Sequence, residues 1–200
     1  MADHYYSRKP HVESAPKHWE YTLRNVRFRF KSDSGVFSKN EVDFGSRLLI
    51  ETFVLPEPAG SLLDVGCGYG PIGLALAKQY PDRTVHMVDV NERALELAKE
   101  NAKANGIENT LVYESDRLFG VEETGFSAIL TNPPIRAGKK TVHDIFAQAK
   151  EKLVANGELW VVIRKKQGAP SALEKLSELF GEVGVVEKEK GYFIIKAKNI

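Results

Sequence analysis

The sequence predicts an α/β fold: a doubly wound, mostly parallel, seven-stranded sheet of Rossmann-like type, with an antiparallel C-terminal hairpin and a small N-terminal β extension. Three observations predict this fold. From residue 61 onward, short apolar segments alternate with helical patterns, as in parallel sheets covered by helices. A glycine-rich segment follows the first apolar segment, where a strand would turn sharply into a helix. The alternation then stops, and only a short charged turn separates the last two apolar segments.

The N-terminal part of the chain predicts a short extension to the main sheet. Residues 1–20 are polar and rich in His, Lys and Pro, so we expect a loose arm before a single domain of residues 21–200. Residues 22–31 alternate aromatic with basic side chains late in the segment, which predicts a strand with one buried face, as half of a hairpin. A Ser-Asp-Ser-Gly turn follows, and residues 42–53 then predict a helix.

The main sheet is predicted from the order of its strands and helices. Parallel strands are expected at residues 61–65, 84–89, 110–114, 128–131 and 158–163, and helices at residues 72–79, 91–105, 141–154 and 171–180. The second of these helices is clearly bounded, because Asn91 can cap its start and Gly106 can end it. Residues 183–186 and 192–197 have no helix between them, so we expect an antiparallel hairpin at the sheet edge.

Composition limits the classes of function. The 200 residues allow one sizeable domain, and the net charge of +1 carries no global signature of a nucleic-acid-binding protein. No apolar run approaches the ~20 residues of a membrane span and no signal-peptide pattern opens the chain, so we expect no membrane association. The single Cys67 excludes an internal disulfide and fits a reducing compartment, so we expect a cytoplasmic protein. The histidines lack metal-ligand spacing, and no metal is expected.

The glycine-rich segment Asp64-Val65-Gly66-Cys67-Gly68-Tyr69-Gly70 predicts a nucleotide-type pocket. Together with Gly73 it matches the dinucleotide fingerprint, and Asp89 stands about 20 residues further on, where a ribose-binding acid belongs. A dinucleotide would place its pyrophosphate on this loop, however, and the Asp64 carboxylate would repel it. The ammonium group of S-adenosylmethionine suits Asp64 instead, so the loop favours this cofactor. A tight turn that binds no ligand is the alternative.

A second segment, Asn132-Pro133-Pro134-Ile135, follows the predicted strand 128–131. An exocyclic amino nitrogen is a poor nucleophile until both its N–H bonds are accepted in a geometry that frees its lone pair. The Asn132 side-chain oxygen and the Pro133 carbonyl can accept these bonds, and the two prolines stiffen the loop. We therefore expect Asn132, Pro133 and Pro134 to be the catalytic residues of a methyl transfer that needs no strong base, metal or covalent intermediate. Alone, Asn-Pro-Pro can also be an ordinary turn.

These segments resemble the class I S-adenosylmethionine-dependent methyltransferases, with the glycine loop, Asp89, Ser115-Asp116 and Asn-Pro-Pro as the matching motifs. Three further segments are similar to the ribosomal RNA guanine-N2 methyltransferases, most of all the small-subunit methyltransferase C (RsmC) type. They are Ser34-Gly35-Val36-Phe37-Ser38, Asp43-Phe44-Gly45-Ser46 and Asn132-Pro133-Pro134-Ile135-Arg136-Ala137-Gly138-Lys139. The resemblance covers about residues 20–197. Familiar bacterial members carry a second, amino-terminal half that helps to find the ribosomal target. This chain has only the half with the motifs, so the target nucleotide and the mode of docking stay open.

The expected cofactor contacts come partly from the residues and partly from the resemblance. Asp89 can accept hydrogen bonds from both ribose hydroxyls, and its alternative role is that of an acid at a helix start. The resemblance implies that Val90 flanks the adenine and that Asp116 accepts from the adenine amino group, although Asp116 can equally be a plain turn residue. The expected cofactor-binding residues are Asp64, Gly66, Cys67, Gly68, Gly70, Asp89, Val90, Ser115, Asp116 and Asn132.

Substrate contacts are predicted from position along the chain. Adenine-N6 and glutamine-N5 relatives usually have an aromatic residue where this chain has Ile135, so we expect Phe37 to supply the stacking platform; its alternative role is core packing. Basic residues follow the strands at 128–131 and 158–163 on the rim of the expected site, and they favour a phosphate-rich substrate over a merely solvated surface. The expected substrate-binding residues are Phe37, Ile135, Arg136, Lys139, Lys140, Lys165 and Lys166.

We therefore predict methyl transfer from S-adenosylmethionine to the N2 amino group of a guanine in small-subunit ribosomal RNA, with ribosomal RNA or the small subunit as the partner. Two alternatives stay open. One is transfer to a protein glutamine, an adenine N6 or a small-molecule amine. The other is a non-catalytic ligand-binding or dehydrogenase-like module, which Asp64 and Asn-Pro-Pro together disfavour. The sequence does not predict an oligomeric state.

Overall fold

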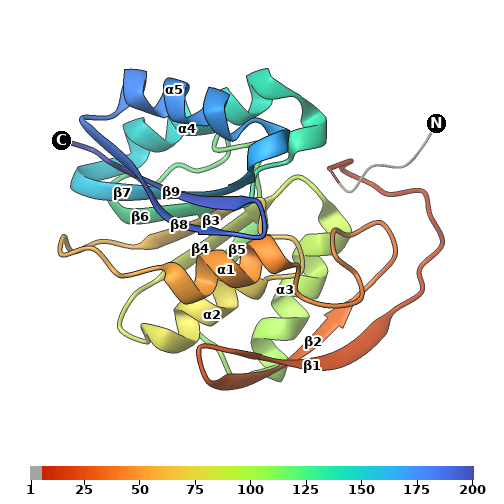
Figure 1. Cartoon of the computed structure of the whole chain (residues 1–200). Helices are drawn as coiled ribbons and strands as arrows, with labels where there is room; N and C mark the ends of the chain where they lie inside the picture. The colour runs from red at the N-terminus through yellow and green to blue at the C-terminus, as the bar shows by residue number, and fades with distance from the viewer. Residues whose placement is uncertain (1–5) are drawn as a thin grey trace.

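A computed structural model describes residues 6–200 and confirms the predicted fold class (Figure 1). The main sheet has the order β5-β4-β3-β6-β7-β9-β8, parallel from β5 to β7 and antiparallel from β7 to β8. Its strands are β3 (Leu62–Val65), β4 (Val85–Asp89), β5 (Thr110–Glu114), β6 (Phe126–Thr131), β7 (Leu153–Arg164), β8 (Glu182–Glu189) and β9 (Tyr192–Lys198). Because the chain runs outward from β3 in one direction and returns at β6 on the other side, the carboxyl ends of these two strands form the switch point where ligands bind.

Helices cover both faces of the sheet, because consecutive residues of a strand point to opposite sides. Leu62 packs in the core under α1 (Phe44–Thr52), α2 (Pro71–Gln79) and α3 (Glu92–Ala104). Its neighbour Leu63 packs in the core under α4 (Lys139–Lys152) and α5 (Ala169–Leu179). Figure 1 shows these two helix layers below and above the sheet. The doubly wound arrangement is confirmed.

The N-terminal extension is an antiparallel hairpin of β1 (Lys17–Leu23) and β2 (Val26–Ser32), which packs against α3. The strand expected at residues 22–31 is split by a turn at Arg24 and Asn25, whose backbones both have positive φ. β1 also begins inside residues 1–20, the segment that polar composition predicts as a loose arm. The alternation of β2 has a counterpart in β1, where Trp19, Tyr21 and Leu23 alternate with polar residues, but the polar composition of residues 1–20 as a whole hides it.

The remaining boundaries differ from the prediction by a few residues. The helix expected to reach residue 154 ends at Lys152, and β7 begins at the next residue, four residues before Gly157. The C-terminal hairpin is confirmed, with longer strands than expected. Among residues 6–200, no helix is long and apolar enough to cross a membrane.

Candidate active site

A cavity of about 340 Å³ lies at the carboxyl ends of β3, β4, β5 and β6. Its wall contains most of the residues that the sequence predicts for the site. These are Phe37, Gly66, Cys67, Gly68, Asp89, Val90, Ser115, Asp116, Asn132, Pro133 and Pro134. The wall also contains Asp43, Ser46 and Tyr69, which the sequence does not single out as site residues. Nowhere in residues 6–200 do three or more His, Cys, Asp or Glu side chains gather closely enough to hold a metal ion.

The loop after β3 presents bare backbone to the cavity. Gly66 and Gly68 have φ angles of 75° and 56°, in the left-handed region that favours glycine. A Cβ on either residue would meet no atom of the described residues within 4 Å, so the space beside this backbone is open to a ligand. Between them, Cys67 is buried, and burial raises the pKa of its thiol. Cys67 is therefore a wall residue and not a nucleophile.

Asp89 ends β4 and ties the glycine loop to the start of α3. Its Oδ2 accepts the Gly68 N–H and its Oδ1 accepts the Asn91 N–H, both at 2.9 Å. Burial raises the pKa of this carboxyl, and the backbone hydrogen bonds oppose that effect. Each carboxylate oxygen has a second lone pair, so Asp89 can still accept hydrogen bonds from a ribose that lies in the cavity beside Val90.

Asp64 and Gly70 differ from the prediction, because neither belongs to the wall of the cavity. The Asp64 side chain is fully buried beneath the loop, where its Oδ2 accepts the Gly73 N–H at 2.9 Å and its Oδ1 has no partner among the described residues. Burial, with added repulsion from Asp89, raises the pKa of Asp64 to about 7. Asp64 thus anchors the start of α2 and does not face a ligand cation directly. Gly70 serves the same turn, since its φ is 108° and a Cβ there would lie 2.9 Å from Leu74.

The loop after β5 carries Ser115 and Asp116. Ser115 Oγ accepts the Gly120 N–H and donates to the Arg117 carbonyl, both at 2.9 Å. The Arg117 guanidinium binds both Asp116 oxygens at 3.0 Å and also pairs with Asp144 at 2.7 Å. Its hydrogen bonds to Asp116 lower the pKa of that carboxyl. Asp116 is therefore an ionised wall residue, and its position fits both an adenine contact and a turn.

The orientation of Asn132, which follows β6, is set by helix α1. Its Nδ2 donates to Asp43 Oδ2 at 3.2 Å and to Ser46 Oγ at 3.1 Å. Asp43 also caps α1 by accepting the Ser46 N–H at 3.0 Å. A carboxylate oxygen accepts hydrogen bonds, so the amide nitrogen of Asn132 faces Asp43, and the amide oxygen is left as an acceptor on this wall residue. Pro133 and Pro134 follow Asn132 in the wall.

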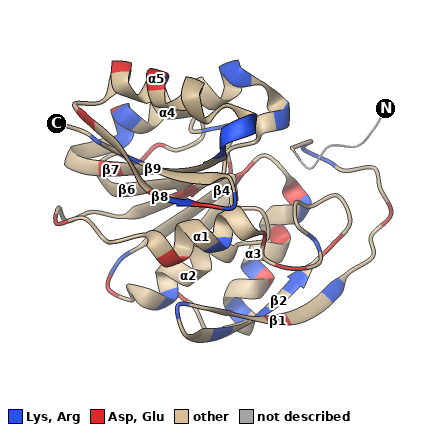
Figure 2. Ribbon diagram, viewed as in Figure 1, with Lys and Arg blue, Asp and Glu red and all other residues tan. Residues whose placement is uncertain are grey.

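Of the residues expected to contact the substrate, only Phe37 belongs to the cavity wall. Phe37 lies in the wall and is 45% exposed. Ile135 starts the short 3-10 helix η1 (Ile135–Ala137) and packs against the core under α4, outside the wall, so its expected substrate contact is not supported. The basic residues Arg136, Lys139, Lys140, Lys165 and Lys166 are exposed and also lie outside the wall. Figure 2 shows the basic residues around the start of α4 and those after β7 on the same side of the molecule.

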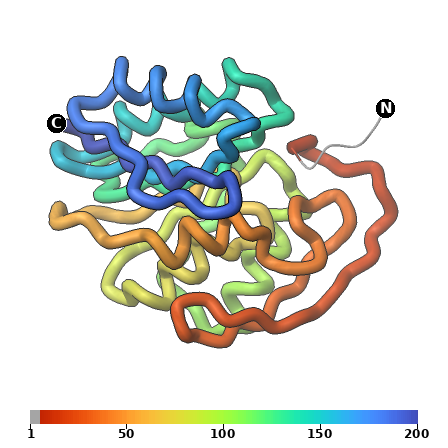
Figure 3. The backbone as a smooth tube through the Cα atoms, in the orientation of Figure 1, coloured from red at the N-terminus to blue at the C-terminus, as the bar shows by residue number. Residues whose placement is uncertain are grey.

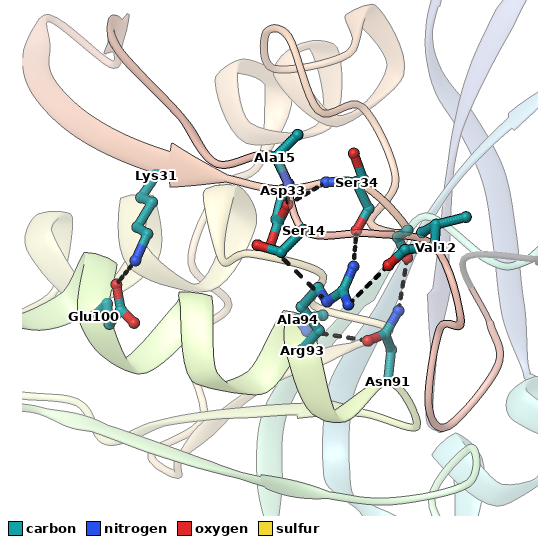
Figure 4. Close-up of polar contacts among 11 residues, drawn as sticks. Val12, Ser14, Ala15, Lys31, Asp33, Ser34, Asn91, Arg93, Ala94 and Glu100 are labelled. Atoms are coloured by element: carbon teal, nitrogen blue, oxygen red, sulfur yellow. Dashed lines mark hydrogen bonds and ion pairs between the residues drawn. The ribbon is translucent and has the colours of Figure 1, made fainter.

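The loop that carries Phe37 is held by the start of α3 (Figure 4). Arg93 donates to the Ser34 carbonyl at 2.7 Å and to the Val12 carbonyl at 3.1 Å. Asn91 Nδ2 donates to the next carbonyl of the same loop at 2.9 Å. No local pattern in the sequence indicates these contacts, because each joins segments more than fifty residues apart.

The expected loose arm is bound to the same loop. Ser14 Oγ and the following backbone N–H donate to Asp33 at 2.7 and 2.6 Å. Arg8 makes ion pairs with acidic residues of α3 and β5, and Tyr6 lies in the cavity wall. Figure 3 shows this segment running from β1 along the outside of the molecule toward the start of α4. Residues 6–16 therefore form a strap, the N-terminal strap, and the prediction of a loose arm is wrong for them.

The chain is similar to known proteins over nearly its whole length. The family model described as methyltransferase small domain matches residues 27–196. A Bacillus subtilis (strain 168) protein called "Uncharacterized protein YbxB" is 64% identical over 201 residues and is matched over all of both chains. Ribosomal RNA small subunit methyltransferase C of Vibrio cholerae serotype O1 is 33% identical over 192 residues, which are 94% of this chain and 54% of that protein. The chain thus spans about half the length of this relative.

The fold agrees with these relatives. The solved structure of the T. thermophilus 16S rRNA N2 G1207 methyltransferase (RsmC) in complex with AdoMet and guanosine matches with a TM-score of 0.83 at 24% identity. The match covers 96% of this chain and 52% of that one. The resemblance stated from the motifs is confirmed. The chain belongs to the methyltransferase small domain family and is a class I S-adenosylmethionine-dependent methyltransferase of RsmC-like type.

Proposed function

We propose that the protein transfers a methyl group from S-adenosylmethionine to the N2 amino group of a guanine in small-subunit ribosomal RNA. One observation carries the proposal: the Asn132 Nδ2 is engaged by Asp43 and Ser46, which leaves the amide oxygen as an acceptor in the wall of the cavity that also contains the bare glycine backbone and Asp89. A binding site for the methyl donor and an acceptor for amino N–H bonds thus share one cavity. Similarity to the RsmC proteins supports ribosomal RNA as the substrate.

The donor side of the cavity binds and orients the cofactor. Asp89 accepts hydrogen bonds from the ribose hydroxyls, and charge-assisted bonds of this kind contribute about 1.5–3 kcal/mol each. Gly66 and Gly68 let the backbone approach the ligand closely, since nothing fills the space beside them. When bound, the cofactor supplies a sulfonium methyl group that an amino nitrogen can attack in line.

The acceptor side prepares that nitrogen. Asp43 and Ser46 accept hydrogen bonds from Asn132 Nδ2, which fixes the amide plane and increases the negative charge on its oxygen. This oxygen and the Pro133 carbonyl accept the two N–H bonds of the exocyclic amino group, so the nitrogen lone pair turns toward the methyl carbon. Because both acceptors are held in place before the reaction, little reorganisation is needed.

The rest of the cavity suits an extruded base. The N2 group of guanine is engaged when the base is paired, so the base must be unpaired or flipped into the cavity. The exposed ring of Phe37 can stack on such a base. Exposed lysines at the start of α4 and in η2 (Lys165–Gln167) supply positive charge for the phosphates around it.

Mass spectrometry of nucleosides tests the proposal. The protein is incubated with methyl-labelled S-adenosylmethionine and, in parallel, with small ribosomal subunits, deproteinised ribosomal RNA or a protein extract. N2-methylguanosine in the RNA is the expected product, and the Asn132→Ala variant should form almost none. N6-methyladenosine would move the enzyme to the adenine class, and label found only in protein would refute the RNA substrate.

A further inference from the structure

Three cationic side chains lie over two neighbouring aromatic rings outside the cavity. The Arg164 guanidinium carbon is 4.6 Å from the centre of the Tyr192 ring. The Lys190 ammonium and the Arg47 guanidinium carbon are 4.6 and 5.0 Å from the centre of the Phe44 ring. The centres of the two rings are 5.5 Å apart. These five residues come from α1, the end of β7 and the β8–β9 hairpin, and we call them the α1–β9 cation cluster.

The three cations of this cluster have no acidic partner in the part of the chain that the structure describes. Within residues 6–200, no carboxylate oxygen lies within 4.0 Å of the side-chain nitrogens of Arg47, Arg164 or Lys190, although Glu189 is adjacent to Lys190 in the chain. Arg117, by contrast, binds two carboxylates. Arg164 and Lys190 are also exposed. The cluster therefore offers uncompensated positive charge in a chain whose net charge is only +1.

The cluster borders the cavity wall. The first turn of α1 packs directly on Tyr192, because a Cβ on Gly45 would lie 2.7 Å from that ring. The same turn carries Asp43 and Ser46, which belong to the wall. On its other side the cluster adjoins η2, where the Lys165 N–H donates to a carbonyl of the β8–β9 turn at 2.9 Å. Figure 1 shows the end of this hairpin beside the start of α1.

We propose that Arg47, Arg164 and Lys190 bind the phosphodiester backbone of the RNA strand that flanks the target base, an inference that rests on the proposed function. The aromatic rings hold the cations by cation–π contacts, so less side-chain freedom is lost when a phosphate binds. The guanidinium N–H groups point outward along the plane of the fork and remain available for bidentate contacts to phosphate oxygens. The same first turn of α1 that packs on the cluster also holds Asn132 through Asp43 and Ser46, so a strand bound by the cluster lies near the acceptor side.

The salt dependence of RNA binding tests the inference. The binding of a short fluorescent single-stranded RNA of mixed sequence is measured by anisotropy over a series of salt concentrations. The triple variant R47Q/R164Q/K190Q should reduce the slope of log Kobs against log salt by about two units, at about 0.7 for each lost phosphate contact. The control K78Q/K103Q/K152Q removes the same charge from the last turns of α2, α3 and α4, at the opposite edge of the sheet. It should keep the parental slope.

Calorimetric binding of S-adenosylmethionine shows whether each variant is folded. If the triple variant is not folded, the single variant R164Q, at an exposed position, replaces it. The slope of R164Q should fall by about 0.7. If the parent protein binds RNA and the triple variant and R164Q both keep the parental salt-dependence slope, the cluster inference is overturned and the proposed function stands. If the parent protein shows no salt-dependent RNA binding, the inference is overturned together with the RNA substrate. A reduced slope confined to the cluster variants supports the inference.

Discussion

The two sides of the cavity hold their polar groups in different ways. On the donor side, Asp89 and Ser115 bind backbone N–H groups of loops that follow neighbouring parallel strands. On the acceptor side, Asn132 is held by the N-cap residue of α1 and by a side chain of its first turn, which lie 89 and 86 residues away in the chain. The donor side is therefore built within the repeating strand–helix units, whereas the acceptor side joins the end of β6 in that repeat to α1, which lies outside it.

This difference implies that the two sides can be changed separately. A donor-side substitution alters hydrogen bonds that exist before and after methyl transfer, so it should change cofactor affinity. An acceptor-side substitution removes a contact to the reacting nitrogen, which matters most in the transition state, so it should change turnover. A variant that changes cofactor affinity and turnover equally would show that the two sides of the cavity do not act separately.

Asn132→Ala should give the largest effect. We expect kcat to fall by about 10²–10³-fold, the usual loss when one preorganised polar group is removed. The Kd for S-adenosylmethionine should change much less, because Asp89 and the glycine loop are untouched. Single-turnover methylation and calorimetry measure the two quantities. An equal loss of cofactor affinity would show that Asn132 belongs to the donor side as well.

Asp89→Ala tests the other side of the comparison. Loss of one or two charge-assisted hydrogen bonds should raise the Kd for S-adenosylmethionine by about 10- to 100-fold. At saturating cofactor, kcat should stay near that of the parent protein. Asp89→Asn keeps one acceptor oxygen and should give an intermediate Kd in the same calorimetric titration. An unchanged Kd for both variants would leave Asp89 with only its structural bonds to Gly68 and Asn91.

Asp43→Ser separates two roles of one positioning residue. Serine still caps α1, so the free energy of unfolding should stay near the parental value. It is shorter and uncharged, however, so the hold on Asn132 Nδ2 should weaken and kcat should fall about tenfold, with KM little changed. Asp43→Ala should lower kcat similarly and also cost about 1 kcal/mol of stability, measured by urea unfolding. Parental kcat in the serine variant would mean that Ser46 alone orients the amide.

The same contrast explains which parts of the site were predictable from the sequence. Asp89 and the glycines follow apolar strands within local strand–helix units, and parallel strands bring their carboxyl ends to one edge whatever the details of packing. Asp43, Ser46 and Arg93 act across long separations in the chain. Their roles depend on how α1 and α3 pack, and a single sequence carries no local pattern for that.

Burial limited the prediction even within the local units. All four residues of β3 are buried, so the strand lacks the polar–apolar alternation that would reveal which way each side chain points. The position of Asp64 beneath the loop could therefore not be predicted from the sequence. Ile135 is partly buried and packs against the core, although its neighbour Pro134 lines the cavity. The N-terminal strap is polar without periodicity, and its order comes from side chains elsewhere, such as Asp33, Arg93 and the acidic partners of Arg8.

Asp64 is a buried ionisable group beneath the donor side, and it should affect stability and not turnover. Burial raises its pKa in the folded state to about 7 from an ordinary 3.8. Between those values the unfolded chain loses the proton while the folded protein keeps it, so rising pH favours unfolding by at most about 1.4 kcal/mol per pH unit. Below and above this window the contribution is constant.

Asp64→Asn removes this titration. The unfolding free energy of the variant minus that of the parent protein should therefore increase between pH 5 and pH 7, as measured by urea unfolding of the cofactor-free proteins. The difference cancels the titrations of groups that do not interact with Asp64, while Asp89, which repels it, does not cancel fully. A difference that stays flat across these pH values would mean that the Asp64 carboxyl ionises in the folded protein as readily as in the unfolded chain.

Arg93→Lys should give the smallest effect, and it tests how far the acceptor side extends. Lysine keeps the charge on α3 but cannot donate in a fork to the Ser34 and Val12 carbonyls, so the strap and the loop of Phe37 should loosen. We expect the KM for RNA to rise about two- to tenfold, the loss of one or two hydrogen bonds, with kcat and cofactor Kd unchanged. Hydrogen exchange at the amides of residues 12–15 and 34–38 should accelerate in parallel.

Lys31→Ala is the matched control, because it removes an ion pair to Glu100 on the same helix without touching the strap (Figure 4). A raised KM with parental exchange would show that Arg93 contacts the RNA itself, and faster exchange with parental KM would confine the strap to a structural role.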